Sequence, residues 1–301
     1  MNATARGRVS IVGAGPGDPE LITMRGLARI RTADVLVYDR LVDPALVGEA
    51  PPAAERVFAG KARGFAALEQ REIEALLIAR AFAGKHVVRL KGGDPYVFGR
   101  GGEEVTALVA AGIPVEVVPG VSSALAAPAS AGIPVTHREL SSSLTIVTGH
   151  EDPTKPEAAI DWDWLAASKG TLVILMGLSQ LPGIRDRLIA GGRSPLTPAA
   201  AIASGTRPDQ RVVTASLADL PEVVAAAQLV APALVVVGDV VRFRELLAPS
   251  ALNGVPVTAM GSGDSRLEPG PALFARVGPS ASESLPAQAD ARSQISGGRD
   301  G

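Results

Sequence analysis

Short apolar runs rich in β-branched residues recur through most of the chain, and stretches with helical periodicity separate them. The runs are continuous rather than alternating, which is typical of strands that are covered on both faces. Strands are therefore expected at residues 9–12, 35–38, 57–59, 87–90, 115–118, 144–148, 172–176, 200–203, 211–214 and 234–237. The alternation of strands with helices predicts an α/β fold on a mainly parallel sheet.

The expected helices divide between the two halves of the chain. They span residues 24–31, 68–83, 103–111, 164–167, 181–190 and 217–227. Two series of five strands predict two α/β domains, 1–119 and 120–248, joined at the turn-forming pair Pro119 and Gly120. After Pro249 the periodicity is lost and Pro, Gly and Ser dominate, so residues 249–301 are expected to be a disordered tail.

Composition excludes several classes of protein. The 301 residues include no cysteine, which excludes disulfides, iron–sulfur clusters and thiolate nucleophiles. A formal net charge of −2 and an aromatic content of 3% argue against nucleic-acid and membrane-surface partners. The chain opens without an apolar segment of signal-peptide length and has no apolar run long enough to span a membrane, so a cytoplasmic location is expected. The three histidines are widely separated, and no metal site is expected.

The first predicted strand leads into a glycine-rich loop with the sequence GAGPGD. Gly13 and Gly15 match the first two positions of the dinucleotide-binding pattern G-x-G-x-x-G, but Asp18 occupies the third. An aspartate would repel a pyrophosphate at the start of a helix, and Pro16 lacks an amide donor. From these residues alone two interpretations stay open: close contact with an uncharged or zwitterionic ligand, or a tight turn without a ligand.

A second glycine loop follows the predicted strand 87–90, within the segment RLKGGDPYVFGRGGEE. Gly92 and Gly93 open this loop, and Asp94 follows them. A carboxylate beside flexible backbone is able to hold an ammonium group or a ribose hydroxyl. The density of glycine and charge exceeds what a plain turn needs, which favours a binding role.

Three segments together carry a resemblance to a known family: GAGPGDPELIT with the following ADVLVYDRLV, then RLKGGDPYVFGRGGEE, then VPGVSSALAAPASAGIPVTHR. They resemble the tetrapyrrole methylases, and most of all the group that methylates uroporphyrinogen III with S-adenosylmethionine. The resemblance runs from about Val9 to about Leu247. It implies two α/β domains with the cofactor in the cleft between them, a homodimer, and a methyltransferase without a fused second enzyme.

The resemblance also implies a set of cofactor-binding residues. The methionine part of S-adenosylmethionine is expected near the two glycine loops, and the adenosine part near the second series of strands. Ser122 and Ser123 stand where the family often has Thr-Ala. Taken alone, Met176 and Ala233 are more readily interpreted as ordinary core residues of strands. The implied residues are Pro16, Gly92, Gly93, Asp94, Val97, Ser122, Ser123, Met176, Gly205 and Ala233.

Asp39 and Lys61 are the residues that the resemblance assigns to proton handling. Asp39 follows a predicted strand, where α/β enzymes place site residues, although a turn aspartate is an equally simple interpretation. Lys61 by itself would be interpreted as a solvated lysine. The implied substrate carries eight carboxylates and requires cations, for which arginine is suited by its bidentate geometry. The candidates besides Lys61 are Arg40, Arg63, Arg100 and Arg138.

The implied reaction transfers methyl groups to carbons 2 and 7 of uroporphyrinogen III, giving precorrin-2 by way of precorrin-1, for sirohaem or cobalamin synthesis. Four alternatives remain at this stage. Two are methyltransferases of the same fold that act on a later corrin precursor or on RNA. The third is a nicotinamide oxidoreductase, against which Asp18 argues. The fourth is a regulatory module that binds the cofactor without turnover.

Overall fold

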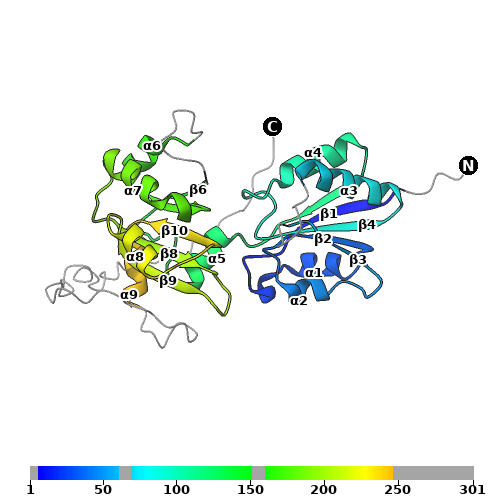
Figure 1. Cartoon of the computed structure of the whole chain (residues 1–301), viewed down its shortest axis with the longest axis horizontal. Coiled ribbons are helices and arrows are strands. Elements are labelled where there is room, and N and C mark those ends of the chain that lie inside the picture. The colour runs from blue at the N-terminus through cyan, green and yellow to red at the C-terminus, as the bar shows by residue number, and fades with distance from the viewer. Residues whose placement is uncertain (1–5, 61–68, 151–159, 247–301) are drawn as a thin grey trace, which may run out of the picture. The chain divides into compact units, whose positions relative to one another are not determined.

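Figure 1 shows the computed structural model of the chain, which describes residues 6–60, 69–150 and 160–246. These residues belong to one compact unit and form two five-stranded sheets with helices packed against them. The predicted tail 249–301 and the candidate residues Lys61 and Arg63 lie outside the described residues. Within the described ranges, no helix is both long and apolar enough to cross a membrane.

The first sheet is parallel in each of its four pairings, with the strand order β3-β2-β4-β1-β5. Its strands are β1 (Arg8–Gly13), β2 (Val35–Tyr38), β3 (Glu55–Phe58), β4 (His86–Lys91) and β5 (Val115–Val118). The helices that alternate with them are α1 (Met24–Ile30), α2 (Pro44–Gly48), α3 (Gln70–Phe82) and α4 (Gly101–Ala110).

Both faces are covered at the central strands β1, β2 and β4, as the continuous apolar runs predict, whereas the edge strand β3 is largely exposed. Figure 1 shows α1 and α2 on one side of the sheet and α3 and α4 on the other. Successive strand residues point to opposite faces. Leu36 accordingly packs in the core on the α1 and α2 side, whereas Val35 and Val37 pack in the core on the α3 and α4 side.

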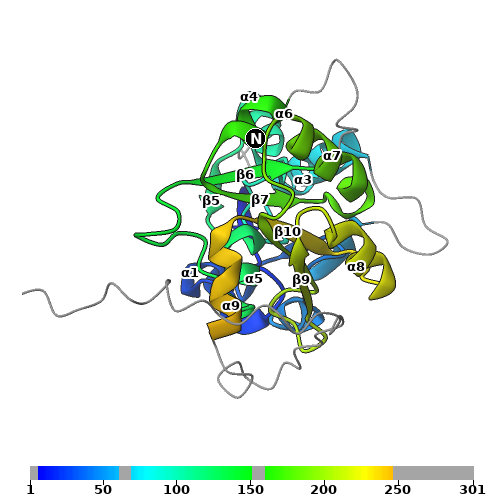
Figure 2. The same ribbon diagram turned by 90° about the vertical axis from the view of Figure 1, so that its left-hand side faces the viewer.

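The second sheet has the strand order β6-β7-β10-β8-β9. Its strands are β6 (Leu144–Thr148), β7 (Thr171–Leu175), β8 (Pro198–Ala203), β9 (Arg211–Ser216) and β10 (Ala233–Val237). Its helices are α5 (Ser123–Ser130), α6 (Trp162–Ala167), α7 (Leu181–Ala190), α8 (Leu220–Ala226) and α9 (Phe243–Leu246). Residues of α5 pack in the core on one face, and residues of α6, α7 and α8 pack on the other (Figure 2).

The expectation of mainly parallel pairing is wrong for this second sheet. Strand β6 pairs with β7 in parallel, but β10 is antiparallel to both β7 and β8, and β8 is antiparallel to β9. Residues 204–210 alone connect β8 to β9. Parallel neighbours need a crossover of about a dozen residues or more, so this short connection permits only antiparallel pairing.

Local capping explains where several helices begin. The side chains of Thr23 and Ser122 accept hydrogen bonds from backbone amides in the first turns of α1 and α5. Asp43 does the same for α2, which has Pro44 at its first position. Helices α2, α5 and α9 are additions to the predicted set. Each is short, and Pro128 inside α5 weakens the helical signal.

The predicted junction at Pro119 and Gly120 falls between β5 and α5. Gly120 is closely packed, because a side-chain carbon there would collide with the carbonyl oxygen of Gly93 and lie 2.7 Å from the Cα of Gly13. The strands of the first sheet precede this junction in the chain, and those of the second sheet follow it. The division into two domains at 119–120 stays a prediction.

Candidate active site

A pocket of about 1080 Å³ lies at the carboxyl ends of β1, β2 and β4. Pro16 follows β1, Asp39 follows β2, and Lys91 is the last residue of β4; all three line the pocket. Residues at the ends of β7, β8 and β10 in the second sheet line it as well. Ligand sites in open α/β sheets lie at the carboxyl ends of the parallel strands, so this pocket is the candidate active site.

The two glycine loops contact each other at the pocket. The amide of Gly93 donates to the carbonyl oxygen of Gly15 at 2.6 Å, and the amide of Gly15 donates to the carbonyl oxygen of Gly93 at 3.3 Å. A side-chain carbon on Gly13 would lie 2.6 Å from that same carbonyl of Gly93. Glycine is therefore required at Gly13 by close packing of backbone against backbone.

Asp94 joins the second glycine loop to the junction after β5. Its Oδ1 accepts from the amide of Tyr96 at 2.8 Å, and its Oδ2 accepts from the amide of Gly120 at 3.1 Å. Asp94 also lines the pocket. Each carboxylate oxygen has a second lone pair, so this side chain is able to accept from a ligand while it holds the loop.

Strained backbone conformations concentrate at the pocket. Five of the six non-glycine residues with positive φ in the described chain line it, and Thr206 is the exception. Such conformations cost about 1–3 kcal/mol each and cluster at functional sites. The five residues are Phe98, Arg100, Met176, Ser204 and Gln228.

All ten residues that the family resemblance implies for cofactor binding line the pocket. Met176 is 49% exposed, so the alternative that it is an ordinary core residue is wrong. The Ser122 hydroxyl caps α5, where it accepts from the amide of Ala124 at 3.3 Å. A side-chain carbon on Gly205 would collide with Ala127 on α5. Ala233 begins β10 and is half-buried.

The charged residues of the pocket lining include more cations than carboxylates. Arg40 and Arg100 were expected there, but Arg138, which the structure describes, is not among the lining residues. Arg100 forms two hydrogen bonds with Glu103, at 2.9 and 2.7 Å, and these hold the pKa of Glu103 below its usual value. The full charged set of the lining is Arg40, Arg89, Lys91, Arg100, Arg207, Asp39 and Asp94.

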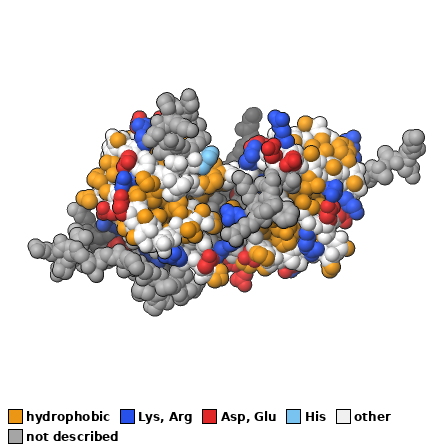
Figure 3. Space-filling view, viewed as in Figure 1, with side chains coloured by type: hydrophobic (Ala, Val, Ile, Leu, Met, Phe, Trp, Pro, Cys, Tyr) orange, Lys and Arg blue, Asp and Glu red, His pale blue; other side chains and the backbone are white. Residues whose placement is uncertain are grey.

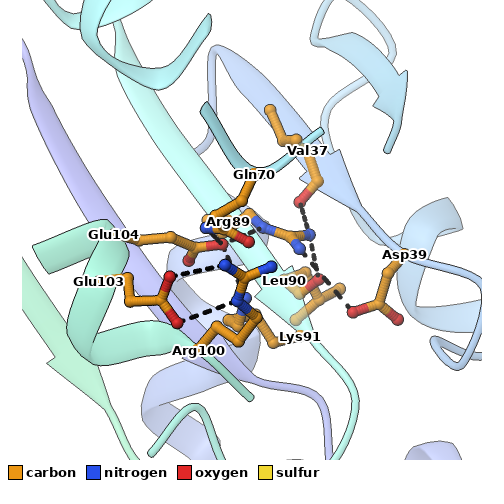
Figure 4. A network of polar contacts seen from close by, with 9 residues as sticks. All are labelled: Val37, Asp39, Gln70, Arg89, Leu90, Lys91, Arg100, Glu103 and Glu104. Atoms are coloured by element: carbon orange, nitrogen blue, oxygen red, sulfur yellow. Dashed lines mark hydrogen bonds and ion pairs between the residues drawn. The ribbon is translucent and has the colours of Figure 1, made fainter. Parts of the chain in front are cut away.

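Arg89, Lys91 and Glu104 form a buried charged cluster at this end of β4 (Figure 4). Oε1 of Glu104 accepts from Nζ of Lys91 at 2.7 Å and from Nε of Arg89 at 3.2 Å. Burial lowers the pKa of Lys91, and the neighbouring charge of Arg89 lowers it further, against the opposing effect of Glu104.

None of the candidate residues chosen from the sequence belongs to this cluster, although the sequence carries a signal for it. The segment VVRLK places two cations, two positions apart, in a strand predicted to be buried on both faces. Residues two apart share one face of a strand, so Arg89 and Lys91 both point toward the α3 and α4 side. Two buried cations require a carboxylate partner, which the helix covering this face of the strand supplies.

Asp39 is both a turn residue and a residue of the pocket. Its Oδ1 accepts from the amide of Leu41 at 3.0 Å, which is the local contact that the simpler interpretation predicts. Its Oδ2 lies 3.9 Å from Nη2 of Arg89 (Figure 4). The carboxylate is partly exposed and lines the pocket, where a ligand can reach it.

Asp18, the departure from the dinucleotide pattern, has a local role. Its side chain accepts from the amide of Glu20 at 2.9 Å and so caps the 3₁₀ helix Pro19–Leu21. Its own amide donates to the hydroxyl of Thr206 at 3.1 Å. Within the described residues, no group of three or more histidine and acidic side chains is placed to hold a metal ion.

Comparisons with known proteins show which family the chain belongs to. The family described as Tetrapyrrole (Corrin/Porphyrin) Methylases matches residues 8–221. The S-adenosyl-L-methionine-dependent uroporphyrinogen III methyltransferase of Methanosarcina barkeri is 51% identical over 241 residues, which cover 80% of this chain and 94% of that protein. The siroheme synthase of Gluconacetobacter diazotrophicus is 49% identical over 254 residues, and these cover 84% of this chain but only 53% of that protein.

A solved structure supports the same assignment. Uroporphyrin-III C-methyl transferase from Thermus thermophilus, complexed with S-adenyl homocysteine, superposes with a TM-score of 0.67 at 42% identity. The superposition covers 78% of this chain and 99% of that one. On these grounds of sequence and fold, the chain belongs to the Tetrapyrrole (Corrin/Porphyrin) Methylases, as the three sequence segments predicted.

Proposed function

We propose that this chain is the S-adenosylmethionine-dependent methyltransferase that converts uroporphyrinogen III to precorrin-2 through precorrin-1. The observation that carries the proposal is a single pocket with two chemically different sides. Its first-sheet side supplies most of the charge and the glycine loops, whereas its second-sheet side is mainly apolar. A polycarboxylate substrate needs the charged side, and the adenosine of the cofactor needs the apolar side.

The residues present suit the bound cofactor. Asp94 retains lone pairs for the ammonium group of the methionine part, and Gly92 and Gly93 let backbone approach it closely. Met176 and Ala233 supply apolar surface and backbone groups for the adenosine part. When bound, S-adenosylmethionine supplies an electrophilic methyl group on a sulfonium that is already a good leaving group. The protein then contributes chiefly proximity and alignment.

Three arginines of the pocket lining are assigned to the substrate carboxylates. Arg40 and Arg100 lie on the first-sheet side, and Arg207 reaches the pocket from the loop after β8. The guanidinium of Arg207 donates to the carbonyl oxygen of Leu41 at 3.2 Å, next to Arg40. Lys61, Arg63 and Arg138 stay candidates from the family resemblance.

We assign to Asp39 the role of general base, which removes the proton that leaves as the methylated ring rearranges. Its carboxylate takes that proton, and the electron pair of the broken bond stays with the tetrapyrrole. Lys61 is the proposed partner that returns a proton elsewhere. Both assignments come from the family resemblance, and the position of Asp39 in the pocket lining supports the first.

The remaining proposals concern partners and location. We infer a homodimer in the cytoplasm that uses no metal, nucleic acid or membrane. On the face drawn in Figure 3, acidic and basic side chains are interspersed rather than gathered in one patch. Together with the net charge of −2, this pattern favours the small-molecule substrate over RNA.

The test is incubation with uroporphyrinogen III and S-adenosylmethionine, followed by mass analysis of the products. We expect two added methyl groups, with the singly methylated species appearing first. Binding of S-adenosylhomocysteine without any methyl transfer would favour the regulatory module instead. Transfer only to a later corrin precursor would favour the alternative substrate. Stabilisation by NADH but not by S-adenosylhomocysteine would overturn the proposal.

A further inference from the structure

The buried cluster on β4 and α4 holds its charges with little access to water. Arg89 and Lys91 are each 4% exposed, and Glu104 is 0% exposed. Burial of ions is costly, and an apolar group of similar volume often replaces a buried ion pair without loss of stability. Stability alone therefore gives no reason for three charges at this position, whereas their geometry supplies one.

Glu104 fixes the two cations. Its Oε1 is the acceptor for Arg89 and Lys91, and also for Nε2 of Gln70 on α3 at 3.3 Å. Glu104 stands in the first turn of α4, where the helix dipole favours a carboxylate. Its attachment to two helices and one strand leaves the carboxylate little freedom to move.

Arg89 extends from this anchor toward the pocket. With Nε bound to Glu104, its Nη1 donates to the carbonyl oxygen of Leu90 at 3.2 Å. A guanidinium is planar and rigid, so two fixed nitrogens determine the position of the third. The third nitrogen, Nη2, faces Oδ2 of Asp39 at 3.9 Å.

The Asp39 carboxylate thus has a neighbour on each side. The amide of Leu41 donates to Oδ1, and Arg89 lies opposite Oδ2. The charges also balance, because Arg89 and Lys91 are matched by Glu104 and Asp39. Without Arg89, only the local turn would orient the carboxylate.

We propose that Arg89, anchored by Glu104, is a positioning residue that sets the orientation of the Asp39 carboxylate in the pocket. This inference rests on the proposed function, in which Asp39 accepts a proton. Arg89 acts through Asp39. Its loss therefore lowers the turnover number more than it changes the Michaelis constant for the tetrapyrrole, and it leaves cofactor binding unchanged.

The test is a double-mutant cycle of Arg89→Met with Asp39→Asn, read by single-turnover methyl transfer at saturating S-adenosylmethionine. We expect Arg89→Met to slow transfer about tenfold or more, with S-adenosylhomocysteine affinity within about twofold of the wild type. The double variant is expected to be no more than about twofold slower than Asp39→Asn alone, because the two residues act as one unit. Rate losses that multiply in the double variant would overturn the proposal.

Arg89→Lys separates geometry from charge. The ammonium keeps the charge and pairs with Glu104, but it cannot also direct a second nitrogen at Asp39. We expect this variant to fold like the wild type and to remain slow. Full recovery of the rate would overturn the proposal, because charge alone would then suffice. If Arg89→Met does not fold, Arg89→Lys takes its place in the cycle.

Arg193→Met is the matched control. Arg193 is 7% exposed, lies outside the pocket lining, and donates to the carbonyl oxygens of Leu165 and Gly170. Its loss should lower the melting temperature without changing the rate per folded molecule. An equal slowing in this control would show that loss of any buried arginine is enough, and would overturn the assignment to Arg89.

Thermal unfolding of the wild type, the two single variants and the double variant tests the contact between Arg89 and Asp39 without measuring activity. This measurement therefore separates the inference from the proposed function. If the wild type transfers no methyl group, the proposed function fails, but the coupling of the two side chains is still measurable. Losses in melting temperature that do not add in the double variant would support the contact. Additive losses would remove it, whatever the activity.

Discussion

The two sheets contribute opposite chemistry to one pocket. Of the seven charged residues that line it, six come from the first half of the chain, and Arg207 is the one from the second among the described residues. The parallel first sheet ends all its strands at one edge, so side chains from several strands converge there. The second sheet pairs mostly antiparallel and contributes a largely apolar wall. We interpret the first half as the part that handles charge and protons, and the second as the part that holds the adenosine.

Asp39→Asn tests the first half most directly. General-base assistance contributes about 10²–10⁴-fold, so single-turnover methyl transfer should slow by that range while S-adenosylhomocysteine affinity stays near the wild-type value. The substitution is nearly isosteric and preserves the acceptor for the amide of Leu41. Unchanged transfer of both methyl groups would make Asp39 a turn residue only. A matching loss of cofactor affinity would move it into the cofactor site.

Asp94→Ala tests whether the first half also holds the methionine part. Loss of a charge-assisted contact costs about 1.5–3 kcal/mol, which is about tenfold to over a hundredfold in S-adenosylhomocysteine affinity by calorimetry. Some loss of thermal stability is also expected, because Asp94 bonds the amides of Tyr96 and Gly120. The control is Asp43→Ala, which removes an aspartate that caps α2 through the amide of Ala45. Equal affinity losses in both variants would contradict a ligand role for Asp94.

Met176→Ala tests the second half. The side chain is half-exposed in the pocket, and removing its contact with an adenosine should cost about 1 kcal/mol, or about fivefold in S-adenosylhomocysteine affinity. The expected effect on the methyl-transfer rate at saturating cofactor is smaller than that of Asp39→Asn. Leu196→Ala, at an exposed site outside the pocket lining, is the control. Unaltered affinity in Met176→Ala would place the adenosine elsewhere.

Because His86 is buried in the first sheet, we expect that sheet to be slightly more sensitive to acid than the second. Burial on β4 lowers the pKa of His86, against the opposing effect of the Thr32 carbonyl, to which Nδ1 donates at 2.9 Å. The unfolded chain then binds the proton more tightly than the folded one. Stability should therefore fall as the pH is lowered from about 6.5, the unfolded value, toward the folded pKa.

Melting temperatures measured between neutral and mildly acidic pH test this prediction. His86→Gln should flatten the slope relative to the wild type and to the control variant His150→Gln, at an exposed position after β6. Amide exchange should report the acid-induced loss of protection first in the first sheet. Loss of protection that begins in the second sheet would contradict the assignment to His86.

The positions of the strands were predictable from the sequence in both sheets, but the direction of pairing in the second sheet was not, for a physical reason. All ten predicted strands are present. Continuous apolar runs report burial on both faces, which holds for central strands such as β4 and β10, whereas the edge strand β3 is largely exposed. Apolar runs say nothing about which strand is the neighbour or in which direction it runs. The insertion of β10 between β7 and β8 is accordingly visible only in the fold. The short β8–β9 connection is the one local feature that could have predicted an antiparallel pair.

Residues of the candidate site show the same division. Pro16, Gly92, Asp94 and four other cofactor candidates lie in the motif segments, three further candidates lie outside them, and all ten line the pocket. Arg138 was selected on the same basis, but it lies outside the lining. Arg207 lies outside the motif segments, and it reaches the pocket because the loop after β8 passes beside the first glycine loop, where Gly17 packs against its side chain.

By itself, then, the sequence determined the family, the strands and the two glycine loops, since these depend on residues that are close together in the chain. Only the tertiary structure decided the surroundings of Asp39. Arg89 lies 50 positions further along the chain, and Glu104 lies 15 beyond that. Their meeting depends on β4 pairing with β2 and on α4 covering one face of β4. A charged residue in a buried strand signals that a partner is needed, but only the packing of helix on sheet determines which residue it is.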